Sequence, residues 1–256
     1  MKEPLHYPMA RVRALQDRVS KTVDTASSLE RAAQRLADIL FEEAAGAFVL
    51  ARVFATVAFE GLPKDDADFA RLTVRKSKVE TLLLPTTPVL SLLGSRGQET
   101  SWNRRTLSKS HRAFPLLSRE FVHARPMISR LLSDLGLPLD GIVRVGKGVK
   151  LQQLMGGAST RLFHVPDART ATDIEGRNIV PQQDFVKTFG VRSVFALGGT
   201  WPNGSAGFFL AFAREVLDIT VARQLAPIMT VFRSVTTSLV MQRRFFEEES
   251  GASSAR

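Results

Sequence analysis

The sequence contains no cysteine and no long apolar run. The absence of cysteine excludes disulfides, thiolate metal sites, cysteine nucleophiles and tetrapyrroles that are attached through a thioether. No stretch of about 18 apolar residues is present, so we expect no membrane-spanning helix. No basic segment leads into an apolar stretch near the N-terminus, so we expect no signal peptide and a cytoplasmic location.

Catalytic and nucleic-acid-binding motifs are missing as well. The four histidines form no H-x-x-x-H pair, which makes a preformed zinc site an unfavourable interpretation. The sequence has no nucleophile elbow, no serine with an evident base and no carboxylate cluster at a fixed spacing, so we expect no catalysis. It has no helix-turn-helix, zinc-finger or RNP motif, so nucleic acid is not an expected partner.

What is present is an ordinary globular composition with unevenly placed positive charge. The 256 residues are 44% hydrophobic and 23% charged, which is typical of one domain with its own core. The net charge is +10, and much of the excess lies in one stretch that contains Arg96, Arg104, Arg105, Lys109, Arg112, Arg119, Arg125 and Arg130. Such a stretch predicts attraction of an anion, a nucleotide or an acidic partner, with a solvated loop as the alternative.

The C-terminal third has the clearest pattern. From Val191 to Phe212, two apolar and aromatic runs flank Pro202-Asn203-Gly204, which predicts a central antiparallel β-hairpin. Upstream, Phe163 to Ala168 predicts a short strand that stops at Pro166, because proline lacks the N–H that a strand ladder needs.

Two helices are expected around this hairpin. Pro181 suits the first position of a short helix that contains Phe185, and Gly190 is an end signal. After the hairpin, an amphipathic helix is expected from Asp218 to about Glu248. Its apolar stripe is longer than one small sheet covers, so part of it is expected to pair with a second subunit.

The order of strand, aspartate-containing loop, short helix, hairpin and long helix resembles the C-terminal half of a GAF domain, a small-molecule sensor module. The resemblance covers roughly Leu29 to Val240 and is clearest from Phe163 onward. It implies an α/β (α+β) fold, in which a central antiparallel sheet carries the N- and C-terminal helices on one face and a ligand pocket on the other.

The resemblance also has limits set by chemistry. GAF domains that attach a bilin through cysteine, or reduce methionine sulfoxide with cysteine, need a residue that this chain lacks. The Asn-Lys-x-Phe-x-x-x-Asp-Glu signature of cyclic-nucleotide-binding GAF domains is missing, and Asp184 to Phe189 offers only a Phe-x-Lys fragment. A covalent bilin is excluded, and a cyclic nucleotide is not the expected ligand.

The N-terminal half predicts two helices and a strand. Met9 to Val23 has loose helical spacing, and Ser27 to Glu30 fits a capping box, in which the serine hydroxyl and the Glu30 carboxylate each satisfy an N–H of the first turn. From Ala47 to Phe59 the residues divide by parity. One predicted face holds the small residues Ala47, Val49, Ala51, Val53, Ala55 and Val57, and the other holds Phe48, Leu50, Arg52 and Phe54.

Arg52 lies among large apolar neighbours on the face that is expected to look toward the ligand. A buried arginine needs a carboxylate, a carbonyl or an anionic ligand, because an unpaired buried charge costs several kcal/mol. A structural salt bridge, or exposure at the sheet edge, is the alternative.

The middle of the chain is less regular. A short covering helix is expected from Asp65 to Lys78 and a strand from Pro88 to Gly94. Arg96 to Ser118 has no clear period and is too polar for a core, which is typical of a binding loop. A helix is expected from Pro126 to Leu135, and the basic, glycine-rich Arg144 to Lys150 is interpreted as an ordinary turn.

These patterns lead to one functional hypothesis. We expect a non-catalytic sensor that binds a small anionic or aromatic metabolite and signals through its terminal helices to a partner protein or a second subunit of a homodimer. Residues 1–26 are expected to form a helical extension, 27–245 the sensor domain with an inserted basic loop at about 96–118, and 246–256 a flexible tail. The candidate ligand contacts are Arg52, Trp102, His111, Arg112 and Phe114, with Phe54, Phe185, Phe195 and Phe208 as candidate walls.

Two alternatives remain open at this point. The first is a GAF-like interaction or dimerisation scaffold without a pocket. The second is a haem sensor, in which His111 coordinates the iron.

Overall fold

The computed structural model describes residues 6–77, 83–108, 111–136 and 160–247. The expected turn from Arg144 to Lys150 lies outside the described residues, as does most of the expected tail.

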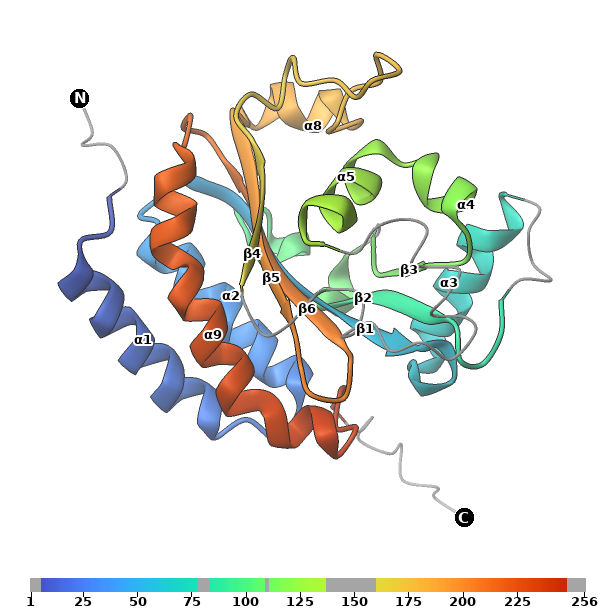
Figure 1. The fold of residues 1–256 in the computed structure, drawn as a ribbon, viewed down its shortest axis with the longest axis horizontal. Helices are drawn as coiled ribbons and strands as arrows, with labels where there is room; N and C mark the ends of the chain where they lie inside the picture. Colours follow the sequence, from blue (N-terminus) through green and yellow to red (C-terminus); the bar gives the residue numbers. More distant parts are fainter. Residues whose placement is uncertain (1–5, 78–82, 109–110, 137–159, 248–256) are drawn as a thin grey trace.

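The centre of the molecule is a six-stranded sheet with the order β3-β2-β1-β6-β5-β4 (Figure 1). Every neighbouring pair of strands is antiparallel. The strands are β1 (Phe48–Ala58), β2 (Pro88–Gly97), β3 (Ala113–Pro115), β4 (Arg161–Val165), β5 (Ser193–Thr200) and β6 (Ala206–Ala213). The expected mixed fold with a central antiparallel sheet is confirmed.

The helices lie on both faces of this sheet, with the first and last helices on the same face (Figure 1). One face carries α1 (Met9–Asp24), α2 (Leu29–Glu43) and α9 (Ile219–Met241). The other carries α3 (Lys64–Arg75), α4 (Arg119–His123), α5 (Pro126–Asp134) and α8 (Gln183–Thr188). Short 3-10 turns occur at Phe59–Gly61, Thr100–Trp102 and Arg105–Leu107. The sheet therefore separates two apolar clusters, which we call the helix-side core and the cavity-side core.

The hairpin forms as the sequence predicts. β5 and β6 pair from Ser193↔Ala213 to Thr200↔Ala206, and the connection closes with a hydrogen bond from the Trp201 N–H to the Ser205 carbonyl. Gly204 has a positive φ of 89°, which glycine adopts without strain. The asparagine–glycine pair therefore supplies the turn, and the flanking apolar runs supply the two central strands.

The start of β1 departs from simple alternation. The pairing with β6 shifts between Phe48 and Leu50, so one extra residue is accommodated there as a β-bulge. Phe48 consequently packs in the helix-side core against Phe195 and Phe209, and Val49 lies in the cavity-side core. The predicted faces of these two residues are wrong, whereas those of the residues from Leu50 to Val57 are confirmed.

β2 continues past the glycine at which it was expected to stop. Gly94 pairs with Val53, and a side chain at Gly94 would lie 2.3 Å from the Ala33 carbonyl oxygen of α2. The glycine is there because helix and sheet approach closely, and the Gln34 side chain then bonds both backbone groups of Ser95. The basic stretch that follows also contains an unexpected edge strand, β3.

α9 ends earlier than its sequence pattern indicated. Arg243 takes a left-handed φ of 58°, and the Arg244 N–H bonds back to the Leu239 carbonyl, which terminates the helix near Met241. The apolar stripe of α9 is covered within the chain, because α1 packs against it in the helix-side core. A second subunit is not needed to bury that stripe.

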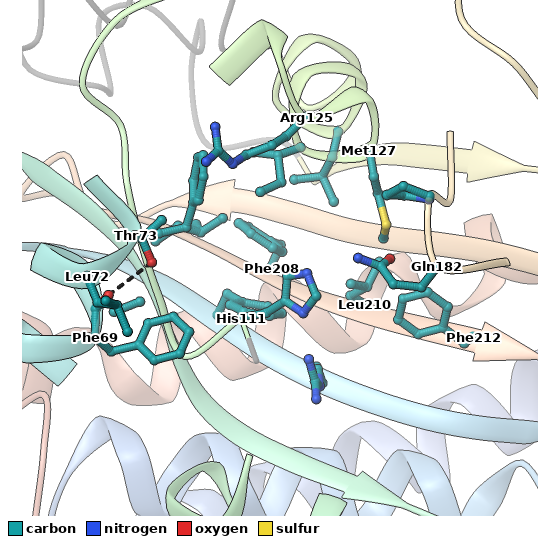
Figure 2. Close-up of a pocket in the computed structure, with 18 of the residues that line it drawn as sticks. Phe69, Leu72, Thr73, His111, Arg125, Met127, Gln182, Phe208, Leu210 and Phe212 are labelled. Atoms are coloured by element: carbon teal, nitrogen blue, oxygen red, sulfur yellow. Dashed lines mark hydrogen bonds between the residues drawn. The ribbon is translucent and has the colours of Figure 1, made fainter. Parts of the chain in front are cut away.

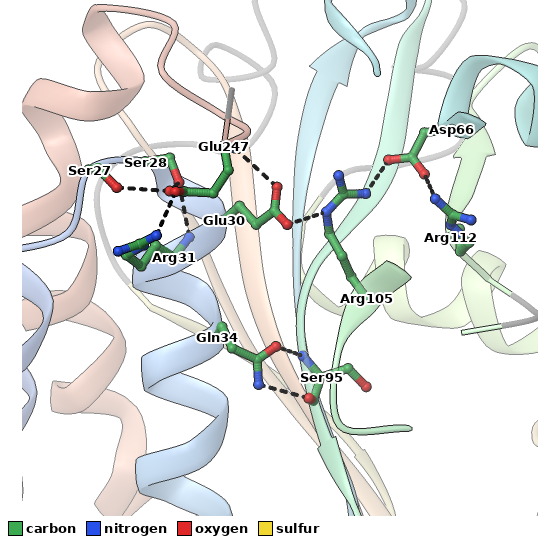
Figure 3. A network of polar contacts seen from close by, with 10 residues as sticks. All are labelled: Ser27, Ser28, Glu30, Arg31, Gln34, Asp66, Ser95, Arg105, Arg112 and Glu247. Atoms are coloured by element: carbon green, nitrogen blue, oxygen red, sulfur yellow. Dashed lines mark hydrogen bonds and ion pairs between the residues drawn. The ribbon is translucent and has the colours of Figure 1, made fainter. Parts of the chain in front are cut away.

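The first turn of α2 is capped in part as expected. The Ser28 hydroxyl accepts the Arg31 N–H at 3.1 Å. The Glu30 carboxylate does not return to its own helix end, and instead accepts the Glu247 N–H and pairs with Arg105 (Figure 3). The capping-box prediction is therefore confirmed for the serine and wrong for Glu30, which is used for a long-range contact.

Candidate functional site

A cavity of about 520 Å³ lies against the sheet face opposite the terminal helices. Its volume falls within the range of about 300–1,000 Å³ that small-molecule sites occupy. The floor is formed by β1, β2 and β6 through Arg52, Phe54, Leu90, Phe208, Leu210 and Phe212. The sheet therefore supplies a mostly apolar and aromatic base with one guanidinium.

The walls of the cavity come from four other parts of the chain (Figure 2). α3 contributes Phe69, Leu72, Thr73 and Lys76. The start of α5 contributes Met127, Ile128 and Leu131, preceded by Arg125. The remaining lining residues are His111, Ala113 and Phe114 before and within β3, and Pro181 and Gln182 before α8. None of the described lining residues carries a carboxylate.

Arg52 is the buried cation of the cavity floor, with 6% of its surface exposed. Its Nη2 donates to the Ser108 hydroxyl at 3.1 Å, and its Nε has no hydrogen-bond partner. Among the described residues no carboxylate forms an ion pair with Arg52. Burial lowers the pKa of Arg52 to about 10, so the guanidinium stays charged at pH 7. Neither alternative explanation, a structural salt bridge or exposure at the sheet edge, is therefore seen for Arg52 among the described residues.

His111 lies over the sheet among the other lining side chains in the close-up view (Figure 2). Its backbone has a left-handed φ of 59°, which is uncommon outside glycine. Burial, and then the positive charge of Arg52, hold the pKa of His111 below its usual 6.5. His111 is also accessible to water, which moderates this shift, but the direction leaves the ring neutral at pH 7.

Arg125 is the second cavity cation and is already engaged. Its guanidinium carbon lies 4.2 Å from the ring centroid of Phe121 and 4.9 Å from that of Phe114. Its Nη1 also donates to the Phe121 carbonyl at 2.8 Å. The two rings and the carbonyl hold this guanidinium in place.

Of the nine residues selected from sequence, the cavity brings together Arg52, Phe54, His111, Phe114 and Phe208. Phe185 and Trp102 lie one layer outside it, because Phe185 packs edge-on against the lining ring of Phe212 and Trp102 packs against Phe185.

The remaining two selected residues lie elsewhere. Phe195 is fully buried in the helix-side core, on the opposite face of the sheet. Arg112 donates to the buried carboxylate of Asp66 at 2.7 Å, so its charge is matched within the chain.

The wall residues of α3 and α5 were not selected from sequence. Both helices have an apolar face that sequence pattern identifies, but pattern alone does not say which sheet face a helix covers. Met127, Ile128 and Leu131 share such a face on α5. The amphipathic spacing of the two helices was the signal in the sequence, and the structure was needed to show which sheet face each helix covers.

Two further properties hold for the described part of the chain. It contains no group of three or more metal-binding side chains of the histidine, cysteine, aspartate or glutamate type. None of its helices combines the length and the apolar character that crossing a membrane requires.

Comparisons with known proteins give only distant structural likenesses. No family model matches the sequence, and no curated protein matches it. The free methionine-R-sulfoxide reductase from Neisseria meningitidis, solved with its substrate, aligns with 94% of this chain and 99% of its own at 12% identity and a TM-score of 0.46. The phycoerythrobilin-bound GAF domain of a cyanobacterial phytochrome aligns with 90% of this chain and 97% of its own at 8% identity and a TM-score of 0.47.

A bacteriophytochrome from the photosynthetic bacterium R. palustris aligns with 93% of this chain at 10% identity and a TM-score of 0.46, and this chain spans 40% of its length. Likeness at this level names no ligand and no activity. What the structure itself shows is the arrangement of its layers. With the terminal helices on one face of a central antiparallel sheet and a cavity on the other, the chain has the GAF-like architecture that the sequence resemblance implies.

Proposed function

We propose that the chain is a non-catalytic sensory or regulatory domain that binds a small anionic or aromatic metabolite in the cavity and signals through its terminal helices. The observation that carries this proposal is the cavity of about 520 Å³, with an aromatic floor and a buried guanidinium. Mostly apolar pockets with a few placed polar groups are the usual form of small-molecule sites.

The lining supports binding rather than chemistry. The described lining residues include three cations and a histidine but no carboxylate, serine or cysteine. A pocket of this kind holds an anion and offers no general acid–base pair of carboxylates. The open volume also distinguishes this proposal from a pocketless interaction scaffold, whose sheet face would be filled with side chains.

Haem is a weaker candidate for the same cavity. His111 lines the cavity and its ring is neutral at pH 7, which is the form that coordinates iron. The guanidinium of Arg52, however, already lowers the affinity of His111 for a proton, and it repels a metal cation in the same way. An absorbance spectrum after haem addition tests this alternative, and our proposal predicts no Soret band.

A polar network supports transmission to the terminal helices (Figure 3). Asp66 of the cavity-wall helix α3 pairs with Arg105, and Arg105 Nε pairs with Glu30 of α2 at 2.8 Å. Glu30 accepts the Glu247 N–H at 3.2 Å, in the segment that follows α9. We propose that this path conveys ligand occupancy to a partner protein or to a second subunit.

The binding proposal is tested by thermal unfolding with a panel of aryl carboxylates, nucleotides and aliphatic diacids. A ligand at about 100 times its dissociation constant adds about 2.7 kcal/mol to the free energy of unfolding. Thr73→Trp, which fills the cavity from α3, is expected to abolish the shift. Arg75→Trp is the matched control, because Arg75 lies on the same helix and is exposed.

Two results would contradict the proposal. One is the absence of a shift with every class in the panel. The other is a shift that Thr73→Trp leaves as large as in the unmodified protein, because the ligand would then bind outside the cavity.

A further inference from the structure

The anion site can be narrowed to one side chain. Arg52 belongs to β1 in the cavity floor, and it pairs with Leu210 on the neighbouring strand β6. It is 6% exposed, and among the described residues its Nε has no hydrogen-bond partner and Ser108 is its single hydrogen-bonded neighbour. A buried guanidinium without a carboxylate is costly, and an anionic ligand removes that cost.

The geometry of a guanidinium selects the kind of anion. Arginine presents parallel N–H groups that match the two oxygens of a carboxylate. In the structure, Nη2 of Arg52 already donates one hydrogen bond to the Ser108 hydroxyl. His111 is neutral at pH 7, and Arg125 is held between two rings and a carbonyl. Lys76 is exposed at the edge of α3. Among the described residues, the cavity interior therefore offers one unengaged guanidinium, that of Arg52, which matches a ligand with a single negative charge.

An aromatic surface lies beside this fork on the same face of the sheet. Phe54 follows Arg52 by two residues on β1, which places the two side chains roughly 7 Å apart along the strand. Phe54 stacks with Phe208 of β6, with ring centroids 5.3 Å apart and an interplanar angle of 25°. One small molecule can therefore reach both the guanidinium and the ring pair.

We infer that the ligand of the cavity is an aryl monocarboxylate, whose carboxylate pairs with Arg52 and whose ring lies against Phe54 and Phe208. This inference rests on the proposed function and adds the ligand class and the residue that selects it. A phosphorylated ligand fits less well, because its second negative charge has no further unengaged cation in the described interior.

The test compares isosteric ligand pairs by titration calorimetry. Benzoate and phenylacetate are measured against benzamide and phenylacetamide, which keep the ring and lose the charge. The unmodified protein is expected to bind each carboxylate at least about tenfold more tightly than its amide. Arg52→Met is expected to reduce that ratio to less than about twofold, with an unchanged fold by circular dichroism.

Arg18→Met is the matched control, since Arg18 forms an exposed pair with Glu42 and does not line the cavity. It is expected to leave the carboxylate preference unchanged. Equal binding of acid and amide to the unmodified protein would overturn the inference. Retention of the carboxylate preference in Arg52→Met would overturn it as well.

The outcomes separate this inference from the proposed function. If nucleotides or diacids bind, Thr73→Trp abolishes their binding, and aryl carboxylates do not bind, the cavity is a ligand site and the assigned ligand class is wrong. If no compound of any class binds, both the inference and the proposed function are wrong.

Discussion

Arg52 holds a positive charge at the floor of the cavity, and the Ser108 hydroxyl is its only hydrogen-bonded partner in the described part of the chain. Removal of a residue that is kept for stability is expected to lower the free energy of unfolding. A residue kept for a ligand behaves in the opposite way, because the unliganded protein carries the desolvation cost of the charge. The two roles of Arg52 can therefore be separated without knowing the ligand.

We predict that Arg52→Met raises the free energy of unfolding of the unliganded protein by about 1 to 3 kcal/mol. Methionine keeps the apolar stem and removes the buried charge. Urea denaturation measures the change, with Arg18→Met as a control, because Arg18 forms an exposed pair with Glu42 and is expected to change stability by less than about 1 kcal/mol. A loss of stability in Arg52→Met would assign the arginine a structural role.

His111 predicts a dependence on pH. Its pKa in the folded protein is lower than the 6.5 of an ordinary histidine, so the unfolded chain binds a proton first as the pH falls. Stability from this group is complete above pH 6.5 and is lost as the pH falls toward the folded pKa. The basic groups that line the same cavity are Arg52, Lys76 and Arg125.

The measurement is the difference in stability between pH 7 and pH 5 for the unmodified protein and for His111→Asn. Asparagine is chosen because it tolerates the positive φ of this position. The variant is expected to lose less stability on acidification, by less than about 1 kcal/mol, because water reaches His111. Equal losses would mean that the ring does not titrate abnormally.

At the scale of single residues, the sequence predicted the correct sheet face for the residues of β1 that follow the bulge. Alternation placed Arg52 and Phe54 on the cavity face, because the pairing of β1 with β6 is regular there. It failed for Phe48, since a bulge changes parity without a signal in the residue types. Arg112 was selected for its charge, but its partner Asp66 lies 46 positions away, a pairing that a single sequence does not reveal.

At the scale of elements, Asp66 fixes α3 to the strand and loop that border the cavity. It is fully buried and bridges Arg105 and Arg112 (Figure 3). Because both arginines are largely buried too, removal of the central charge takes the Asp66 carboxylate from two guanidinium groups and leaves Arg105 with Glu30 alone. The wall of the cavity therefore depends on a side chain that does not line it.

Asp66→Asn is predicted to lower the free energy of unfolding by about 3 to 5 kcal/mol. Asp68→Asn on the same helix is the control, because Asp68 pairs with Lys64 and Arg71 at the surface and is expected to cost less than about 1 kcal/mol. Chemical denaturation of both variants gives the comparison. Similar small costs for both would show that the buried network contributes little.

Element prediction succeeded where local chemistry decides and failed where packing decides. The hairpin turn contains Gly204, and the N-cap of α2 is a serine, so both follow from residue type. Gly94 was interpreted as a strand end, although it is required by the approach of α2 to β2. The short edge strand β3 owes its existence to pairing with β2, which no local pattern indicates.

At the scale of the whole molecule, the segment after α9 is tied directly to the start of α2. The N–H groups of Leu29 and Glu30 donate to the carbonyls of Arg244 and Phe245, each at 2.8 Å. The Glu30 carboxylate pairs with Arg105, and Arg105 pairs with Asp66 of the cavity-wall helix α3. Spatial continuity alone does not establish coupling, so the path needs a direct test.

Hydrogen exchange provides that test. Saturation of the cavity with an aryl carboxylate is expected to slow exchange of the Leu29 and Glu30 amides in the unmodified protein. Glu30→Gln is expected to remove most of this protection while changing the affinity for the ligand by less than about twofold, since Glu30 does not line the cavity. Equal protection in both proteins would exclude the Glu30–Arg105 contact as the connection.

The central claim is that a carboxylate binds the guanidinium of Arg52 inside the cavity. Nitrogen-15 NMR of arginine side chains observes this contact directly, with the Nε–H signal of Arg52 assigned by its loss in Arg52→Met. On titration with phenylacetate, that signal is predicted to shift and to exchange more slowly with water, whereas phenylacetamide is predicted to leave it unchanged. An Arg52 signal that stays unchanged at saturating phenylacetate would contradict the account.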